Sequence, residues 1–192
     1  MYRTTPLRKV KKEGKFYTPL WIVKIARNYI SESLEPDWTD NYTVWDCAAG
    51  SGNLFAEMEQ KNNFFASSID ENEIILMKER SSNGEIGVPP QNIFQYDFIN
   101  GNFMSSDLPE CIAQAKKPFL FFVNPPYLSD GGLDISTKFL LRMRHEFKNC
   151  IIACFTKPLW CMPASKKFNE EFECSPICKH FYHGLSFNSK EF

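Results

Sequence analysis

The sequence is short of glycine and has no long apolar run. Glycine makes up 9 of its 192 residues, and no stretch approaches the roughly 20 apolar residues that a membrane-spanning helix needs. The first 15 residues lack the apolar segment of a secretion signal, and the seven cysteines are an odd number. We therefore expect neither a collagen-like chain, nor a membrane protein, nor a secreted disulfide fold, and we expect a cytoplasmic location with reduced thiols.

The composition that remains is typical of one globular domain. The chain is 43% apolar and carries 29 aromatic residues, and a domain of this length buries about 70% of its unfolded surface. The net charge is −1, but the first 30 residues carry a net charge of +7. A basic arm over residues 1–15 can contact nucleic-acid phosphates, or it can be a solvated tail, and the sequence favours neither reading.

Near the end of the chain, four residues have the side-chain types of a zinc site. They are Cys174, Cys178, His180 and His183. Their spacing does not match the usual paired Cys-x-x-Cys arrangement. We expect ordinary thiols here and no metal.

Short apolar runs alternate with helical patterns along the chain. We expect strands over 43–46, 64–69, 92–98, 119–123, 149–155 and 179–185, and helices over 21–30, 71–80, 133–147 and 164–172. A loop that feeds a further helix is expected over 50–60. This alternation predicts an α/β fold with a doubly wound, mainly parallel sheet, in which ligands bind at the carboxyl ends of the strands.

The segment Asp-Cys-Ala-Ala-Gly-Ser-Gly-Asn follows the first of these strands. Its residues of interest are Asp46, Ala48, Gly50 and Gly52. Glycines allow a tight turn and a close approach of a ligand to the backbone. An acid, a glycine turn and a following helix together indicate a nucleotide-like ligand more strongly than a lone Gly-x-Gly does.

Further acids follow the next two strands. Asp70 comes 18 residues after Gly52, where a carboxylate can accept hydrogen bonds from ribose hydroxyls or cap the next helix. We favour the ribose role, and both can hold. Asp97 and Phe98 follow the third strand, where a carboxylate can accept from an exocyclic amine and a phenyl ring can pack on a purine.

The segment Asn124, Pro125, Pro126 and Tyr127 directly follows the apolar run at 119–123 and carries the strongest signal. Two prolines fix the backbone and remove two N–H donors. The Asn124 amide oxygen and the Pro125 carbonyl then form a paired acceptor for a planar NH2 group, and Tyr127 offers a face to the substrate plane. A simple proline-rich turn is the alternative that we consider weaker.

Upstream, Tyr17, Thr18 and Pro19 precede the first helix. Thr18 can cap this helix with Pro19 in its first position, which is sufficient to explain the segment locally.

Together these segments resemble the S-adenosylmethionine-dependent N6-adenine DNA methyltransferases of restriction–modification systems. The segment at Tyr17 resembles motif X, the one at Asp46 motif I, Asp70 motif II, Asp97 motif III and Asn124 the catalytic motif IV. The resemblance implies a Rossmann-like class I methyltransferase fold. It also implies that S-adenosylmethionine contacts the residues named at motifs X, I, II and III, together with Asn124, and leaves as S-adenosylhomocysteine.

The motif order is similar to the gamma arrangement, and Asn rather than Ser at position 124 favours adenine over cytosine N4. The implied catalytic residues are Asn124, Pro125, Pro126 and Tyr127, which would hold the N6 amine of an adenine flipped out of DNA. No Pro-Cys dipeptide is present, which argues against the cytosine C5 enzymes.

The resemblance places a catalytic domain at 16–192, without a target-recognition domain, and the strand hairpin that closes the family's sheet is expected to be missing. Target recognition is then left to a partner subunit or a separate C-terminal domain. Three other interpretations stay open. One is a protein glutamine N5-methyltransferase, which shares the same motif IV, and a less favoured one is an RNA guanine N2-methyltransferase. The third is a non-catalytic module that binds cofactor or a partner.

Overall fold

One parallel sheet organises the chain. The computed structural model describes residues 17–103, 108–127 and 134–156, and within them five strands run in parallel in the order β3-β2-β1-β4-β5. The strands are β1 (Thr43–Asp46), β2 (Phe64–Ser68), β3 (Ile93–Gln95), β4 (Phe119–Val123) and β5 (Ile151–Cys154). The predicted doubly wound, Rossmann-like α/β fold is confirmed. The basic arm, the helix at 164–172, the strand at 179–185 and the cysteine–histidine cluster lie outside the described residues.

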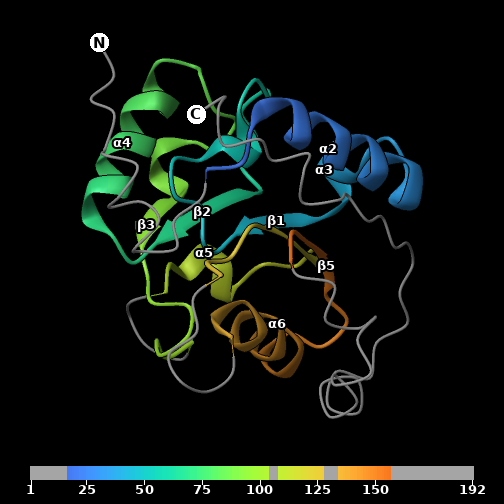
Figure 1. The fold of residues 1–192 in the computed structure, drawn as a ribbon, viewed down its shortest axis with the longest axis vertical. Helices are drawn as coiled ribbons and strands as arrows, with labels where there is room; N and C mark the ends of the chain where they lie inside the picture. Colours follow the sequence, from blue (N-terminus) through green and yellow to red (C-terminus); the bar gives the residue numbers. More distant parts are fainter. Residues whose placement is uncertain (1–16, 104–107, 128–133, 157–192) are drawn as a thin grey trace. The chain divides into compact units, whose positions relative to one another are not determined.

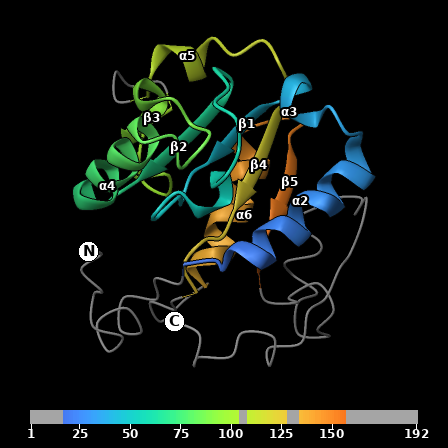
Figure 2. The same cartoon turned by 90° about the horizontal axis from the view of Figure 1, so that it is seen from above.

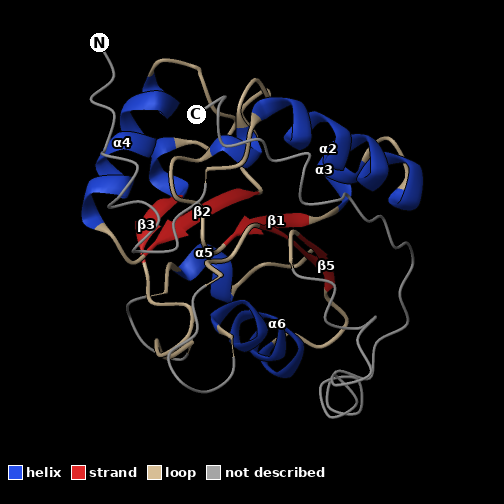
Figure 3. Ribbon diagram, in the orientation of Figure 1, coloured by secondary structure: helices blue, strands red, loops and turns tan. Residues whose placement is uncertain are grey.

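Helices cover both faces of this sheet. The described helices are α2 (Leu20–Leu34), α3 (Trp38–Asn41), α4 (Glu71–Ser82), α5 (Glu110–Ala113) and α6 (Ile135–Glu146), with 3-10 turns η1 (Asn53–Phe55) and η2 (Pro90–Asn92). Figures 1 and 3 show α2, α3 and α4 on one face and α5 and α6 on the other. None of these described helices is long and apolar enough to cross a bilayer.

Successive residues of a strand point to opposite faces of the sheet. Because helices cover both faces, the side chains on both sides of the central strands are buried. On β1, Val44 packs in the cluster that includes α2 and α4, while Trp45 packs in the cluster that includes α6. On β4, Leu120 and Phe122 join the first cluster and Phe121 joins the second. Each such fully buried side chain contributes about 1.5–3 kcal/mol, so the apolar runs fix both the strands and the layers.

The cluster on the α6 face is aromatic. The Trp45 ring lies 5.3 Å from the ring of Phe98 and 5.7 Å from that of Phe121, measured between ring centroids. Its indole Nε1 donates to Ser67 Oγ at 3.1 Å, which satisfies the one polar atom of this buried side chain.

The chain order of the strands reverses between β1 and β4. Figure 2 shows these two strands side by side, with β2 and β3 beyond β1 and β5 beyond β4. Their register pairs Val44 with Leu120 and Trp45 with Phe121. In open parallel sheets, ligands bind at the carboxyl ends of the strands at such a reversal. Here those ends carry Asp46 and the segment that begins at Asn124.

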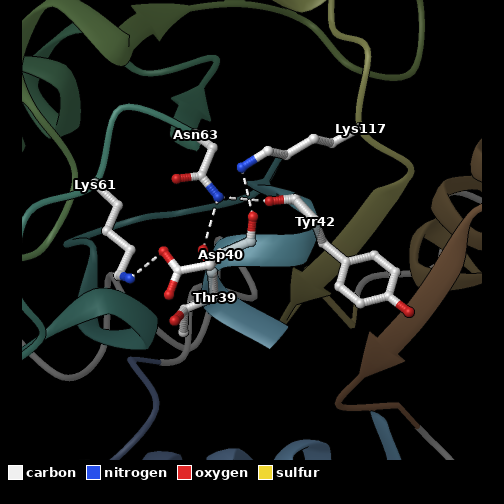
Figure 4. A network of polar contacts seen from close by, with 6 residues as sticks. All are labelled: Thr39, Asp40, Tyr42, Lys61, Asn63 and Lys117. Carbon is white, nitrogen blue, oxygen red and sulfur yellow. Dashed lines mark hydrogen bonds and ion pairs between the residues drawn. The ribbon is translucent and has the colours of Figure 1, made fainter. Parts of the chain in front are cut away.

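At the amino-terminal end of the strands, side chains satisfy backbone carbonyls (Figure 4). Asn63 Nδ2, just before β2, donates to the carbonyl oxygens of Thr39 at 2.7 Å and Tyr42 at 2.6 Å. Lys117, just before β4, donates to the Asp40 carbonyl, and Lys61 forms an ion pair with the Asp40 carboxylate. This network ties α3 to the starts of three strands.

The expected helix after Gly50 is wrong. The segment forms only the 3-10 turn η1, and Ala56 then bridges to Ile86 in extended conformation. Arg27 of α2 donates to the carbonyl oxygens of Leu54 at 2.6 Å and Ala56 at 2.8 Å. These carbonyls are the acceptors that a continuing helix would need, so a tertiary contact replaces the local one.

Candidate active site at the carboxyl ends of the strands

The amide of Asn124 stands at the centre of the candidate site. The residue follows the last residue of β4, so the buried strand fixes its backbone. Its Nδ2 donates to Thr18 Oγ1 at 2.8 Å, and its Oδ1 accepts from the Tyr127 hydroxyl at 2.7 Å. The structure thus brings together three predicted site residues that are up to 109 positions apart in the sequence.

Thr18 does not cap the first helix. The cap position of α2 is Pro19, and it makes no side-chain capping bond. The carbonyl of Pro19 accepts from the N–H groups of Ile22 and Val23 instead. Thr18 is only 5% exposed, and its hydroxyl oxygen accepts from Asn124 Nδ2. The Thr18 hydroxyl therefore accepts from a residue distant in the sequence instead of from the start of α2, and no local sequence pattern predicts such a contact.

The glycine turn after β1 has the predicted form. Gly50 and Gly52 have φ angles of 54° and 79°, a region that favours glycine. A Cβ on Gly52 would lie 3.0 Å from Ile86 Cδ1, so this position also lacks space for a side chain. A Cβ on Gly50 would lie 3.5 Å from the ring of Tyr17. The aromatic ring of Tyr17 therefore lies against the turn, and the two segments are neighbours in the structure.

Asn53, which the sequence analysis did not single out, joins this turn to Thr18. Its Nδ2 donates to the Thr18 carbonyl at 3.1 Å, and its Oδ1 accepts from Arg80 Nη1 at 2.8 Å. Arg80 also donates to the Ser51 carbonyl and pairs with Glu85. The guanidinium of α4 therefore fixes the turn, and the turn fixes the backbone beside Asn124.

Asp46 is a buried acid at the end of β1. It is 1% exposed, and its Oδ1 accepts from the Ala48 N–H at 3.1 Å. Burial is the main cause that raises its pKa to about 8, and the nearby Glu73 carboxylate adds to the rise. Burial raises the pKa of the Cys154 thiol at the end of β5, and the nearby Asp46 carboxylate adds to this rise. An ionised Asp46 is therefore costly unless a cation lies beside it.

Glu73, in the first turn of α4, is a second buried acid that the sequence analysis missed. It is 8% exposed, and it accepts from Ser68 Oγ at 2.5 Å. The sequence signal was available, because Glu73 lies three residues after the helix cap Asp70, where a Glu often turns back toward the helix start. Here it reaches the last residue of β2 instead.

Asp70 acts as the cap of α4. Its Oδ1 accepts from the N–H of Asn72 at 2.9 Å, and its own N–H donates to Ser68 Oγ at 3.1 Å. The strand ends two residues earlier, at Ser68. Capping is thus established, and the ribose contact of Asp70 stays a prediction.

Asp97 and Phe98 follow β3. Asp97 accepts from the N–H groups of Ile99 and Asn100, both at 3.0 Å. Partial burial raises its pKa, but these bonds and the Asn100 side chain lower it more, so the pKa lies below its usual value. Phe98 is 2% exposed and its ring stacks on Phe139 at 5.4 Å. The core thus uses this ring, and its contact with a cofactor stays a prediction.

Part of the chain matches a known protein family. Residues 4–76 match the family model described as N-6 DNA Methylase. This segment contains the predicted motifs from Tyr17 to Asp70 and ends before Asn124. No curated protein matches the sequence.

Among solved structures, similarity is weak. A structure titled "cryoEM structure DrdV-DNA complex" aligns with 66% of this chain at 18% identity and a TM-score of 0.48. The chain spans about 15% of the length of that structure's chain.

The other three residues of the Asn-Pro-Pro-Tyr segment, which follow Asn124 in the chain, are buried or half-buried. Pro125 is buried, while Pro126 and Tyr127 are half-buried. Desolvation is the main cause that raises the pKa of the Tyr127 phenol, and the nearby Cys154 and Asp134 raise it further. The hydroxyl therefore keeps its proton and can donate to Asn124. The site can therefore present an oriented amide oxygen beside a buried acid and a glycine turn.

Proposed function

We propose that this chain transfers a methyl group from S-adenosylmethionine to the N6 amino group of adenine in DNA. The observation that carries the proposal is the Asn124 amide, which lies at the strand-order reversal and is held by Thr18 and Tyr127. The match of residues 4–76 to the N-6 DNA Methylase model supports the same reaction class.

The residues at the site fit the proposed cofactor. S-adenosylmethionine supplies a methyl group on a cationic sulfur and also carries an ammonium group. Asp46 and Glu73 are buried near each other, and their proximity contributes to the raised pKa of Asp46. A bound cation relieves both the desolvation and the repulsion. The positive φ angles of Gly50 and Gly52 turn the backbone tightly just after Asp46.

We assign the cofactor to the segments around this turn. Its ribose would contact Asp70, and its adenine would contact Asp97 and Phe98. Its methionine part would be surrounded by Tyr17, Thr18, Pro19, Asp46, Ala48, Gly50, Gly52 and Asn124. The lowered pKa of Asp97 lets its carboxylate stay ionised at a lower pH than an ordinary aspartate would.

Asn124 and Pro125 would bind the target amine. The amide oxygen of Asn124 and the carbonyl oxygen of Pro125 would each accept one N–H of the adenine N6 group. Two such bonds leave the nitrogen lone pair directed away from the protein acceptors and orient it for reaction. Tyr127 and Pro126 would contact the plane of the base. Adenine N6 is inaccessible inside a duplex, so the base must be flipped out.

The experiment uses the full chain, tritiated S-adenosylmethionine and an adenine-containing duplex. We expect label in DNA and N6-methyldeoxyadenosine in the digest, detected by mass spectrometry. A duplex of only G·C pairs is the substrate control. Asn83→Ala is a matched protein control, because Asn83 is an exposed asparagine that caps the far end of α4.

Two outcomes would replace the proposal. Label in a release-factor substrate but not in DNA would assign the chain to glutamine N5 methylation, since a carboxamide NH2 presents the same paired N–H groups. Binding of S-adenosylmethionine without transfer to either substrate would assign a non-catalytic module.

A further inference from the structure

An asparagine amide can work at this site only in one orientation. Its oxygen must face the target amine, and its NH2 must find a partner elsewhere, because the amide offers two donors on one side and an acceptor on the other. Rotation by 180° about the last side-chain bond would present donors to donors. An acceptor at the NH2 end and a donor at the oxygen end both disfavour this rotation.

We propose that Thr18 is the positioning residue that holds Asn124 in its catalytic orientation. The hydroxyl oxygen of Thr18 lies 2.8 Å from Asn124 Nδ2 and takes the NH2 end of the amide. Tyr127 donates to the oxygen end at 2.7 Å, so the two ends of the amide have partners of opposite hydrogen-bonding type. This assignment rests on the proposed function, because it concerns the same amide.

The Thr18 hydroxyl can serve this role because its own position is fixed. The side chain is nearly buried, and the backbone carbonyl of Thr18 accepts from Asn53 Nδ2 at 3.1 Å. Arg80 in turn holds Asn53 at 2.8 Å. The line of contacts runs from α4 through the glycine turn to Thr18 and then to Asn124. The turn predicted to bind cofactor and the amide predicted to bind substrate are therefore connected through one threonine.

The first test separates positioning from cofactor binding. Thr18→Val keeps the side-chain shape and removes the acceptor, Thr18→Ser keeps the acceptor, and Thr43→Val is the matched control, because Thr43 is a buried threonine at the opposite end of β1. In single-turnover transfer to DNA at saturating S-adenosylmethionine, we expect Thr18→Val to lose about 10- to 100-fold. Thr18→Ser should stay within about threefold of the parent, and Thr43→Val should match the parent.

Two kinetic results would overturn the assignment. The first is a Thr18→Val variant that transfers methyl groups at the parental rate. The second is a Thr18→Val variant whose rate is lower only below saturating S-adenosylmethionine, which would mean that only cofactor binding is weakened. Should Thr18→Val fail to fold, as judged by thermal unfolding, Thr18→Ala replaces it with the same expectations.

The second test needs no transfer activity, so it holds even if the proposed reaction is wrong. The side-chain NH2 signals of Asn124 are identified in a 15N–1H spectrum by their absence in Asn124→Asp. We expect Thr18→Val to shift both signals and to speed their exchange with water by about tenfold, while Thr18→Ser and Thr43→Val leave them in place. Unchanged signals in Thr18→Val would overturn the proposal, and absence of methylation in the parent would count against the proposed function alone.

Discussion

The two ends of the sheet use polar side chains in opposite ways. At the amino-terminal end, Asn63, Lys61 and Lys117 point donors at carbonyl and carboxylate oxygens, so opposite partners meet (Figure 4). At the carboxyl end, two acids are buried near each other, and the pKa of Asp46 rises to about 8. The first arrangement stabilises the fold as it stands. The second disfavours the ionised form of Asp46, and acids with such perturbed pKa values are typical of functional sites.

The difference follows from the parallel sheet. All strands begin at one end, where the preceding turns expose carbonyls that need donors, and all finish at the other, where side chains of several loops meet. Substitutions at the carboxyl end should therefore affect binding and rate, and those at the amino-terminal end should affect stability. Four substitutions test this separation.

Asn124→Ala should have the largest effect. It removes the amide oxygen predicted to hold the target amine, and loss of such an oriented acceptor costs about 100- to 1,000-fold in rate. Affinity for S-adenosylmethionine should fall much less than the rate, because Asn124 is one of several proposed cofactor contacts and the acids and the glycine turn stay in place. Single-turnover transfer and calorimetric binding measure the two quantities. A variant that transfers methyl groups at the parental rate would remove the role assigned to Asn124.

Asp46→Asn should weaken S-adenosylmethionine binding by about 30-fold or more, because a buried cation would lose its charged partner. For the parent, affinity should rise with pH up to about 8, since the cation binds the ionised carboxylate and binding releases a proton. Titration calorimetry in buffers of different ionisation enthalpy measures this proton. An affinity that is flat between pH 6 and 8 would contradict the role of Asp46.

The raised pKa of Asp46 should also make the free energy of unfolding depend on pH. Its pKa is about 8 in the folded chain and 3.8 in the unfolded chain, so between these values the folded state holds a proton that the unfolded state lacks. Without cofactor, the free energy of unfolding should fall as pH rises through this window and level off above it. Asp46→Asn should remove that slope, which thermal unfolding across the pH range will show.

The sequence predicted the frame of the site better than its contacts. The strands at 43–46 and 119–123 have the predicted bounds, because runs buried on both faces have few alternative structures. Asp46 and Asn124 therefore appear where expected. The partners of Asn124 could not be read in the same way, since the Thr18 contact spans 106 positions. The helix expected after Gly50 failed for a similar reason, because Arg27 takes its carbonyls.

Asn63→Ala should destabilise the chain and leave the site intact. Its NH2 group satisfies two carbonyl oxygens at the start of the sheet, and leaving partly buried carbonyls without a donor costs about 1–3 kcal/mol. Chemical denaturation measures the loss. Affinity for S-adenosylmethionine, measured well below the unfolding transition, should stay within about twofold of the parent. A larger change in affinity would show that the two ends of the sheet are coupled.

Lys61→Met should have the smallest effect. The ion pair between Lys61 and Asp40 lies at the surface, where Asp40 is 64% exposed, and such pairs contribute about 0–1 kcal/mol because water and salt screen them. The methionine keeps most of the aliphatic stem. Denaturation in low and in high salt separates the charge from the packing, and the small difference between variants should vanish in high salt. A loss of stability as large as that of Asn63→Ala would contradict this expectation. It would mean that Lys61 holds Asp40 in place for Lys117, whose amine donates to the Asp40 carbonyl. The contacts at the amino-terminal end would then form one cooperative network.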